Sequence, residues 1–271
     1  MSAPTRVASA SPFDRLPPRS GPAGPLSGVR VLDLSAYIAG PYGCSLLADQ
    51  GAEVLKIEPP DGDNLRKYPS SLAAESRAFL GVNRSKYGLV LDLKCAEGRA
   101  ALERCLTAAD VLVHNFRPGV PERLGIAYAD LQARHPRLIY CAVTGYGEHG
   151  PLAGHAGYDQ VLQTRSGMCV QQGKPGGAPE ILYGSVVDYY AAALLSAGVA
   201  SALYEREQRR RPVRRRFLVA QRAGDAVGAP RVGRGRATRG RARHAFGRRH
   251  RHPSDARRLP LPLGQHRAFL A

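Results

Sequence analysis

Apolar positions along the first 208 residues recur at two periods, and the change from one period to the other predicts alternating strands and helices. Short runs that are apolar at alternate or consecutive positions, and that end at polar, glycine or proline residues, predict strands. Stretches with apolar residues three or four positions apart predict helices. The predicted strands cover 28–34, 52–57, 88–93, 110–114 and 138–143, and the predicted helices cover 40–51, 96–108, 121–131 and 185–207.

Strands that alternate with helices at this spacing favour an α/β fold of the Rossmann-like type, with a parallel sheet and helices on its faces. Ligands of such sheets bind at the carboxyl ends of the strands. The loops that begin at Ser35, Glu58, Asn115 and Thr144 each follow a predicted strand. We therefore expect these loops to form the rim of a site.

Both ends of the chain differ in composition from the patterned part between them. Residues 1–25 are rich in Ser, Pro, Ala and Arg and lack the continuous apolar core of a secretory signal, so we expect a disordered leader. Residues 209–271 hold 19 Arg, no Lys and two acids, a surplus that equals the net charge of +17 of the whole chain. The chain thus divides into a leader, a patterned segment 26–208 and an Arg-rich tail that we expect to be disordered.

Three interpretations of the tail stay open. An Arg-rich arm can bind nucleic acid by neutralising phosphates, and a solvated low-complexity extension is the second interpretation. The absence of Lys beside 19 Arg favours the third, a GC-rich coding sequence translated in a shifted frame, which leaves no specific nucleic-acid partner. Codons can be chosen so that 211–226, shifted by one base, reads G-Q-Y-V-D-V-S-L-L-R-S-A-L-A-M-Q. That reading has the apolar pattern that the written tail lacks.

The composition argues against several other classes of protein. The longest apolar stretch, 191–203, is well short of the roughly 20 residues that span a bilayer, so it predicts a buried helix and no membrane partner. The five cysteines lack a CxxC pair and the eight histidines lack ligand spacing, so we expect neither a disulfide framework nor a metal site. Such cysteines favour the reducing cytoplasm as the compartment.

Several motifs occur in the order and spacing of one known family. They are V-L-D-L-S-A-Y-I-A-G-P at 31–41, K-I-E-P-P-D-G-D at 56–63, N-R-S-K at 83–86 followed by L-D-L-K at 91–94, and N-F-R-P-G at 115–119. Over about 26–207 they resemble the family III CoA-transferases, the relatives of formyl-CoA transferase and carnitine CoA-transferase. The shifted reading G-Q-x-V-D-V-S-L-L is similar to what that family has after its long helix. The resemblance implies the large, CoA-binding domain of the family, incomplete in this chain.

The resemblance implies a nucleophilic aspartate at Asp188, which attacks an acyl-CoA thioester to give an aspartyl anhydride and then an aspartyl-CoA thioester. CoA and acyl-CoA are then substrates, a carboxylic acid is the acceptor, and no cofactor is bound permanently. The oxyanions of these steps need N–H donors, which we expect from Gly184 and the helical turn after it, with Tyr158 in the same region. By itself, S-V-V-D at 185–188 also fits a helix capping box, and the two roles are compatible.

The resemblance also implies a set of CoA contacts. The basic members suit the phosphates of CoA, and the aromatic member suits its adenine. The set is Ile38, Ala39, Leu91, Asp92, Leu93, Lys94, Asn115, Phe116, Arg117 and Arg123. Asp33 and Asp92 lie inside predicted strands, where a structural hydrogen bond is the simpler role.

Two features separate the chain from members of this family. Relatives that racemise α-methylacyl-CoA esters use a His before an Asp, where this chain has Tyr158 before Asp159. Tyrosine has an ordinary pKa of about 10 and is no base at neutral pH, which favours transfer over isomerisation. A racemase-like isomerase and a non-enzymatic fragment with a nucleic-acid-binding arm stay as alternatives.

Members of the family also have a smaller second domain and form interlocked homodimers, so we expect a chain broken after about Gln208 to aggregate or to be inactive.

Overall fold

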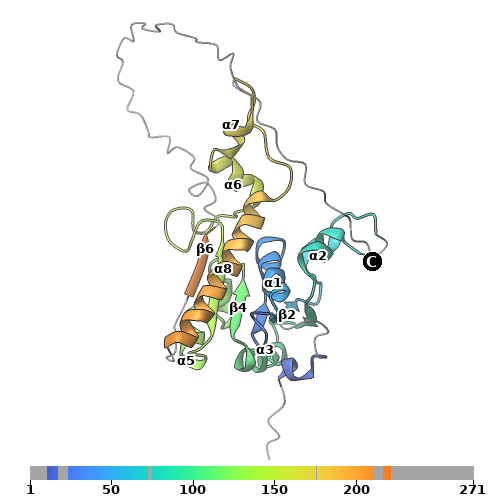
Figure 1. The fold of residues 1–271 in the computed structure, drawn as a ribbon, viewed down its shortest axis with the longest axis vertical. Coiled ribbons are helices and arrows are strands. Elements are labelled where there is room, and N and C mark those ends of the chain that lie inside the picture. Colours follow the sequence, from blue (N-terminus) through green and yellow to red (C-terminus); the bar gives the residue numbers. More distant parts are fainter. Residues whose placement is uncertain (1–10, 18–23, 73–74, 175, 210–215, 221–271) are drawn as a thin grey trace, which may run out of the picture. The chain divides into compact units, whose positions relative to one another are not determined.

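A computed structural model describes residues 11–17, 24–72, 75–174, 176–209 and 216–220. The chain divides into two units, Met1–Pro230 and Arg231–Ala271, and every described residue belongs to the first. The described residues form helices around one parallel sheet, which confirms the predicted α/β fold (Figure 1).

Six parallel strands within the described residues form the sheet, in the order β3-β2-β1-β4-β5-β6. From β1 the chain adds β2 and β3 on one side, whereas β4 begins the other half with β5 and β6. The halves meet where β1 pairs with β4. The strands are β1 Arg30–Asp33, β2 Glu53–Glu58, β3 Tyr87–Val90, β4 Val111–His114, β5 Ile139–Thr144 and β6 Arg216–Ala220.

Helices cover both faces of this sheet. α1 and α8 pack on one face, and α3 and α5 pack on the other. The helices are α1 Ala39–Asp49, α2 Arg77–Val82, α3 Ala96–Ala108, α4 Val120–Leu124, α5 Tyr128–Arg134, α6 Asp159–Arg165, α7 Met168–Gln172 and α8 Val186–Arg209, with 3-10 turns η1 Pro12–Arg15 and η2 Asn64–Lys67.

Successive residues of the central strands enter opposite cores, as the two-residue period of a strand requires. Val31 of β1 packs with α1 and α8, whereas Leu32 packs with α3 and α5. Val111 and Leu112 of β4 divide in the same way. Because both faces of these strands are covered, 110–114 reads as a continuous apolar run rather than as an alternating one.

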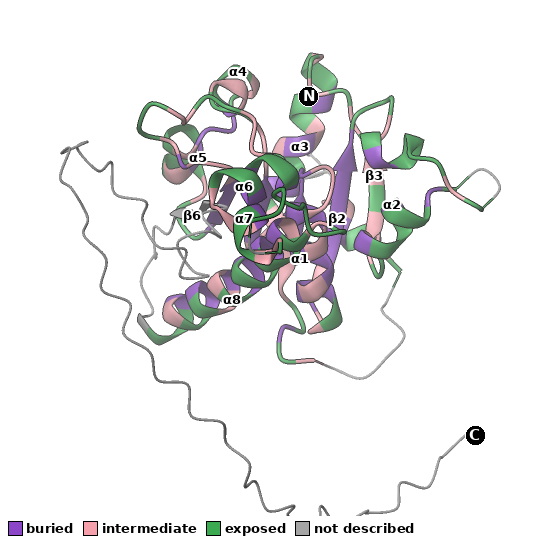
Figure 2. Cartoon of the chain, turned by 90° about the horizontal axis from the view of Figure 1, so that it is seen from above, coloured by how far each residue is buried: buried purple, intermediate pink, exposed green. Residues whose placement is uncertain are grey.

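α8 is a core helix with one exposed side (Figure 2). Leu195 and Val199 are fully buried against α1 and the sheet, whereas Leu194 and Tyr204 are 45% and 69% exposed. By length and composition this helix could cross a membrane, but its apolar residues are also what the core of an α/β domain needs. The buried side accounts for the apolar run at 191–203.

The carboxyl end of α8 is fastened to the sheet by Arg206. Its guanidinium is buried, and Nη2 lies 2.8 Å from Asp110 Oδ1. Arg206 Nη1 also donates to the carbonyl of Arg137 at 3.3 Å. Asp110 in turn accepts the N–H of Arg30 through its other oxygen at 3.0 Å, so this contact joins α8 to the beginning of β1.

Most predicted elements are present, with shifted ends. The helix predicted at 96–108 is α3, and the strand predicted at 88–93 ends at Val90, because the next residues turn toward α3. The helix predicted at 121–131 is two short helices, since the chain turns at Gly125 with a φ of 69°. The pattern predicts neither α2 nor α6 nor α7, which are all short.

The sequence predicts disorder in 1–25 and 209–271, and the structure differs at one place in each. Pro12–Arg15 form η1, whose Phe13 is 2% exposed and packs in the core beside α3. Arg216–Ala220 form β6, which pairs in parallel with β5. The strand contains the short apolar run F-L-V-A at 217–220, and the edge of a sheet offers unpaired backbone groups to such an extended segment. The rest of the predicted tail beyond the end of α8 lies outside the described residues.

Candidate functional site

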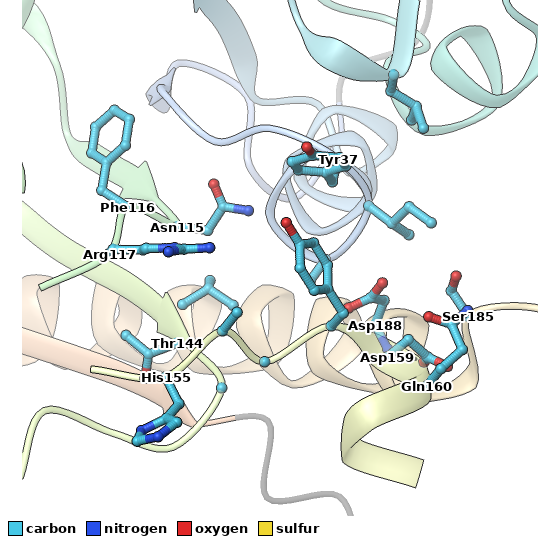
Figure 3. Close-up of a pocket in the computed structure, with 18 of the residues that line it drawn as sticks. Tyr37, Asn115, Phe116, Arg117, Thr144, His155, Asp159, Gln160, Ser185 and Asp188 are labelled. Atoms are coloured by element: carbon cyan, nitrogen blue, oxygen red, sulfur yellow. Dashed lines mark hydrogen bonds between the residues drawn. The ribbon is translucent and has the colours of Figure 1, made fainter. Parts of the chain in front are cut away.

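A pocket of about 280 Å³ lies at the carboxyl ends of the strands, where the strand order reverses (Figure 3). Its wall is formed by the loops after β1, β2, β4 and β5, by 153–160 and by the beginning of α8. Open α/β sheets bind ligands at such a point, because the loops of the two halves diverge there. All four loops of the predicted rim contribute to the wall.

One side chain joins the two halves of this wall. Asn115 Oδ1 accepts the N–H of Ala36 at 2.9 Å, and Asn115 Nδ2 donates to the Ala36 carbonyl at 2.7 Å. The loop after β4 is thereby fixed to the loop after β1. Asn115 lines the pocket, but its amide already binds protein backbone on both of its polar atoms.

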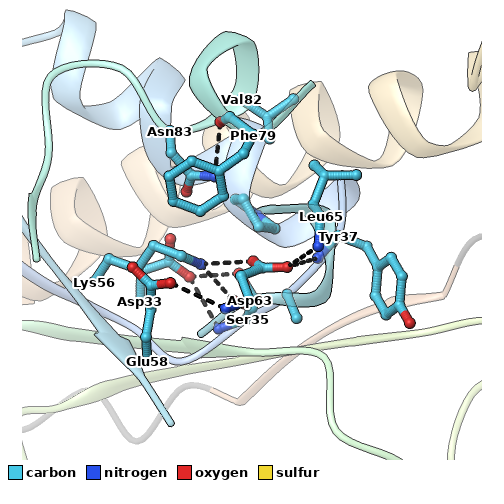
Figure 4. Close-up of polar contacts among 12 residues, drawn as sticks. Asp33, Ser35, Tyr37, Lys56, Glu58, Asp63, Leu65, Phe79, Val82 and Asn83 are labelled. Atoms are coloured by element: carbon cyan, nitrogen blue, oxygen red, sulfur yellow. Dashed lines mark hydrogen bonds and ion pairs between the residues drawn. The ribbon is translucent and has the colours of Figure 1, made fainter. Parts of the chain in front are cut away.

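Buried charged side chains support the loop after β1 (Figure 4). Lys56 Nζ lies 3.1 Å from Asp63 Oδ2 and donates to the Ser35 carbonyl at 2.8 Å. Asp63 Oδ1 accepts the N–H groups of Tyr37 at 3.3 Å and Leu65 at 2.9 Å. Buried charges are costly unless they are paired and hydrogen-bonded, so Lys56 and Asp63 cannot move apart without a large cost in free energy. It holds Tyr37 at a φ of 63°, which is uncommon outside glycine, in the wall of the pocket.

A second buried ion pair connects β1 to the N-R-S-K motif. Lys86 Nζ lies 2.8 Å from Asp33 Oδ2, and both side chains are buried. Burial raises the pKa of Asp33, but the ammonium groups of Lys86 and Lys56 outweigh it and lower the pKa to about 2. Asp33 also accepts the N–H of Ser35 at 3.0 Å, so the pair supports the same pocket loop. The structural role that the sequence suggests for Asp33 is confirmed.

The amino end of α8 lies at the pocket and is capped by a side chain from α6. Asp159 Oδ1 accepts the N–H groups of Val187 at 2.6 Å and Asp188 at 3.2 Å. Figure 3 shows Asp159 and Asp188 close together at this corner of the pocket, with Ser185 beside them. The amino end of a helix carries partial positive charge, which the carboxylate of Asp159 complements here.

This cap differs from the one that the sequence suggests. The N–H of Asp188, which a capping box would give to Ser185, is bound by Asp159 instead. The same contact engages two N–H groups, those of Val187 and Asp188, in the helical turn from which we expect oxyanion donors. Ser185 lines the pocket, and the neighbouring Gly184 does not belong to its wall.

The pocket brings together seven of the predicted site residues and leaves six outside its wall. Those in the wall are Asp188, Tyr158, Ile38, Ala39, Asn115, Phe116 and Arg117. Those outside are Gly184, Leu91, Asp92, Leu93, Lys94 and Arg123. Asp92 Oδ1 accepts the N–H of Lys94 at 2.9 Å in the turn before α3, and Arg123 is exposed on α4. Contacts of these outer residues with CoA stay a prediction.

Sequence reasoning does not find several other residues of the wall. His155 lines the pocket, although its place in the sequence carries no signal of a site. Asp159 is adjacent to Tyr158 in G-Y-D, but its contact with α8 joins residues 28 positions apart and has no local pattern. Tyr37 lies in the wall with its backbone in the left-handed region, a conformation that a tyrosine in the sequence does not predict.

The polar side chains of the wall carry carboxylates, hydroxyls, amides, an imidazole and a guanidinium. Across the described residues, no three His, Cys, Asp or Glu side chains gather in a group that could hold a metal ion. Ser185 and Thr144 carry hydroxyls, which need a base before they can attack, whereas the carboxylate of Asp188 needs none. The arrangement therefore suits attack by Asp188.

The fold and the site define a class: an α/β domain whose pocket lies at the reversal of strand order and contains a carboxylate from the first turn of a long helix. Comparison with known proteins gives the family. Residues 26–211 match CoA-transferase family III, and the chain belongs to that family.

Individual relatives agree with this assignment. The chain is 43% identical to acetyl-CoA:oxalate CoA-transferase of Acetobacter aceti over 189 residues, which cover 69% of this chain and 49% of the relative. The crystal structure of a variant of the Mycobacterium tuberculosis protein Rv3272 has a TM-score of 0.70 at 36% identity and covers 76% of this chain and 56% of that one. A CAIB/BAIF family protein from Brucella suis has a TM-score of 0.71 at 30% identity with the same coverage. The chain spans about half the length of the curated relatives it matches.

Proposed function

We propose that this chain is part of an acyl-CoA:carboxylate CoA-transferase in which Asp188 is the nucleophile. The observation that carries the proposal is the position of Asp188, in the first turn of α8 and in the wall of the switch-point pocket. Membership of CoA-transferase family III supports it, as does the Acetobacter relative, whose name states transfer between acetyl-CoA and oxalate.

The reaction proceeds by four acyl substitutions at carbonyl carbon. The Asp188 carboxylate attacks the thioester, the C–S bond breaks, and a mixed anhydride and CoA thiolate form. The thiolate then attacks the aspartyl carbonyl, which releases the donor acid and leaves an aspartyl-CoA thioester. An acceptor carboxylate attacks that thioester and frees the thiolate again. Attack of the thiolate on the acceptor carbonyl of this second anhydride gives the new acyl-CoA and restores Asp188.

The size of the pocket suits the thioester end of the substrate, with the nucleotide end outside. Phe116 and Arg117 lie in the wall after β4, and Arg117 is exposed, so its guanidinium can meet a phosphate there. Lys94 and Arg123, outside the wall, are further candidates for the phosphates of CoA. In this proposal CoA is a substrate, and no cofactor is bound permanently.

Intact mass spectrometry of the protein after incubation with acetyl-CoA tests the role of Asp188. In a version of the chain with a restored reading frame, we expect a covalent CoA adduct that hydroxylamine removes, since hydroxylamine cleaves thioesters. Asp188→Asn keeps the shape of the side chain but removes the nucleophile, so the adduct disappears. The control is Asp61→Asn, the same change at an exposed carboxylate outside the pocket, which keeps the adduct.

The same experiment separates the proposed reaction from its alternative. Oxalate added to the adduct discharges it if the chain is a transferase. An isomerase exchanges the α-proton of its acyl-CoA with deuterium from the solvent and needs no acceptor. No adduct from the wild-type chain, nor from a version with a restored reading frame, contradicts the assignment of Asp188.

We also propose that the active form is an interlocked homodimer. The exposed side of α8 supports this proposal, because Tyr190, Leu194 and Tyr204 present apolar surface along the helix (Figure 2). Light scattering coupled to size-exclusion chromatography measures the mass in solution. A monomer for both the wild-type chain and the frame-restored version contradicts this part of the proposal.

We propose further that the reading frame changes shortly after Gln208. The family match ends at residue 211, close to Arg209, where the Arg-rich composition begins. The coding sequence around codon 208 is the test. One inserted or deleted base that restores a continuous family match supports the proposal, and an open frame with no such base contradicts it.

A further inference from the structure

Gln163 is a buried amide on α6 that no step of the proposed reaction uses. Its side chain is 0% exposed. Gln163 Oε1 accepts the N–H of Leu182 at 2.9 Å, and Nε2 donates to the Leu182 carbonyl at 3.4 Å. Nε2 also donates to Asp159 Oδ2 at 2.5 Å. One side chain thus binds both the segment that leads to α8 and the carboxylate that caps α8.

The chain between Leu182 and Asp188 is fixed at both ends from α6. Gln163 binds the backbone of Leu182, and Asp159 binds the N–H groups at the beginning of α8. Asp159 and Gln163 are four residues apart, so they share one face of α6. Ser185, between the two attachment points, lines the pocket. The path of this segment therefore depends on two side chains of one short helix.

We propose that Gln163 is a positioning residue: it fixes the segment 182–188 through Leu182 and Asp159, and thereby places the carboxylate of Asp188 in the pocket. The reactive role of Asp188 rests on the proposed function. The contacts that place it do not.

Donors and acceptors explain why an amide is needed at this position. A carboxylate at 159 only accepts hydrogen bonds, and one oxygen already takes two N–H groups, so the other needs a donor. Gln163 supplies that donor and offers an oxygen to Leu182. Glutamate at 163 has the same shape but no donor, and two carboxylates in contact disfavour each other's charge. Asparagine at 159 lacks the second acceptor instead: its NH₂ group faces the NH₂ group of Gln163, so two donors meet and no hydrogen bond forms.

Swapping the amide and the carboxylate between positions 163 and 159 tests the proposal in the full chain. Gln163→Glu and Asp159→Asn are made singly and together. In the double variant the amide at 159 donates to the carboxylate at 163, which still accepts the N–H of Leu182. We expect amide hydrogen exchange in the peptide that covers 182–188 to be about tenfold or more faster in each single variant, and much closer to wild type in the double variant, in which only the 3.4 Å bond to the Leu182 carbonyl has no counterpart.

Gln171→Glu is the matched control, because it makes the same change at an exposed position on the neighbouring α7, and it leaves the exchange unchanged. If a single variant fails to fold and the double variant folds, that is rescue and supports the proposal. Unchanged exchange in both single variants overturns it. The proposal is also overturned if the amides of 182–188 in the double variant are as unprotected as in the worse single variant, or if the double variant is as unfolded as that one. A residue that only fills space would gain nothing when the amide and the carboxylate trade places.

The transfer assay adds a second measurement. We expect Gln163→Glu to lower kcat for CoA transfer from acetyl-CoA with little change in KM, and the double variant to recover part of kcat. If neither the wild-type chain nor its frame-restored version forms an adduct, the proposed function fails. The exchange measurement still decides whether Gln163 fixes the segment.

Discussion

Gly145 and Gly157 lie backbone against backbone in the wall of the pocket. A Cβ added to Gly157 would lie 2.4 Å from the Cα of Gly145, and a Cβ added to Gly145 would lie 2.6 Å from the Cα of Gly157. The loop after β5 and the segment before α6 therefore meet with no side chain between them. Their contact sets how far apart these two parts of the wall are.

Gly157→Ala is expected to separate the two segments, because the added methyl group meets backbone that cannot move aside. Overpacking of this kind costs about 1–3 kcal/mol of the free energy of unfolding, which urea denaturation measures. Gly154→Ala is the control, since a Cβ there has nothing within 4 Å. Equal stability of the two variants would show that the contact between the glycines is not tight in solution.

Asn115→Asp is expected to unfasten the loop after β1 from the loop after β4. The change keeps an acceptor for the N–H of Ala36 but places an oxygen against the Ala36 carbonyl, where Asn115 has its donor. We expect a loss of about 1–3 kcal/mol in the free energy of unfolding and weaker binding of CoA by calorimetry. Gln171→Glu makes the corresponding amide-to-carboxylate change at an exposed residue outside the pocket and leaves both nearly unchanged. A similar loss in both variants would contradict this role.

Asp33 gives the stability of the domain a defined dependence on pH. Its pKa of about 2 lies below the ordinary value of 3.8, so the folded state binds fewer protons than the unfolded state. Its contribution is fully present above about pH 4 and is lost as the pH falls toward 2. Denaturation curves across this range measure the loss, to which the lowered pKa of Glu58 adds in the same direction.

Asp33→Asn is expected to lower the free energy of unfolding at pH 7 by about 3–5 kcal/mol, because it leaves the ammonium group of Lys86 buried without its partner. In this variant the free energy of unfolding also falls less steeply between pH 4 and pH 2 than in the wild-type chain. Asp61→Asn, at an exposed carboxylate, changes neither quantity. A wild-type slope in the Asp33 variant would mean that other carboxylates carry the acid sensitivity.

Leu195→Ala and Leu194→Ala form a matched pair of neighbouring residues on α8, the first buried and the second exposed. Leu195 is fully buried and lies so close to α1 that a Cβ on Gly43 would be 2.9 Å from its Cδ2. For the monomer we expect a loss of about 2–5 kcal/mol for Leu195→Ala and about 0.5 kcal/mol or less for Leu194→Ala, measured by chemical denaturation at a concentration where light scattering finds no dimer. Equal losses would indicate that the exposed side of α8 is covered in solution.

The sequence predicts the fold well where the signal is local. β1, β2, β4 and β5 are short runs that are apolar at alternate or consecutive positions, and α1, α3 and α8 have apolar residues at helical spacing. α6 and α7 are too short for a period to emerge, and α6 is fixed largely by what Asp159 and Gln163 bind in a later segment. β6 is missed because its apolar run, F-L-V-A at 217–220, is short and stands alone within the Arg-rich tail.

The site was predictable to a similar extent. The order of strands and helices places the loops after β1, β4 and β5 at one edge, and the family resemblance selects Asp188. The contacts that shape the wall are non-local: Asn115 binds Ala36 across 79 positions, and Asp63 binds the N–H of Tyr37 across 26. Such pairs leave no periodic trace in a single sequence, so the residues that position the site appear only in the structure.

The anchoring of α8 by Arg206 makes this helix a rod fixed at both ends. Eighteen residues separate Asp188 from Arg206, about 27 Å along the helix axis, with the cap from Asp159 at one end and the ion pair to Asp110 at the other. Such a rod can neither slide nor turn about its axis without breaking one attachment. The position of Asp188 is thus tied to the amino ends of the two central strands, entirely by residues that precede the Arg-rich tail.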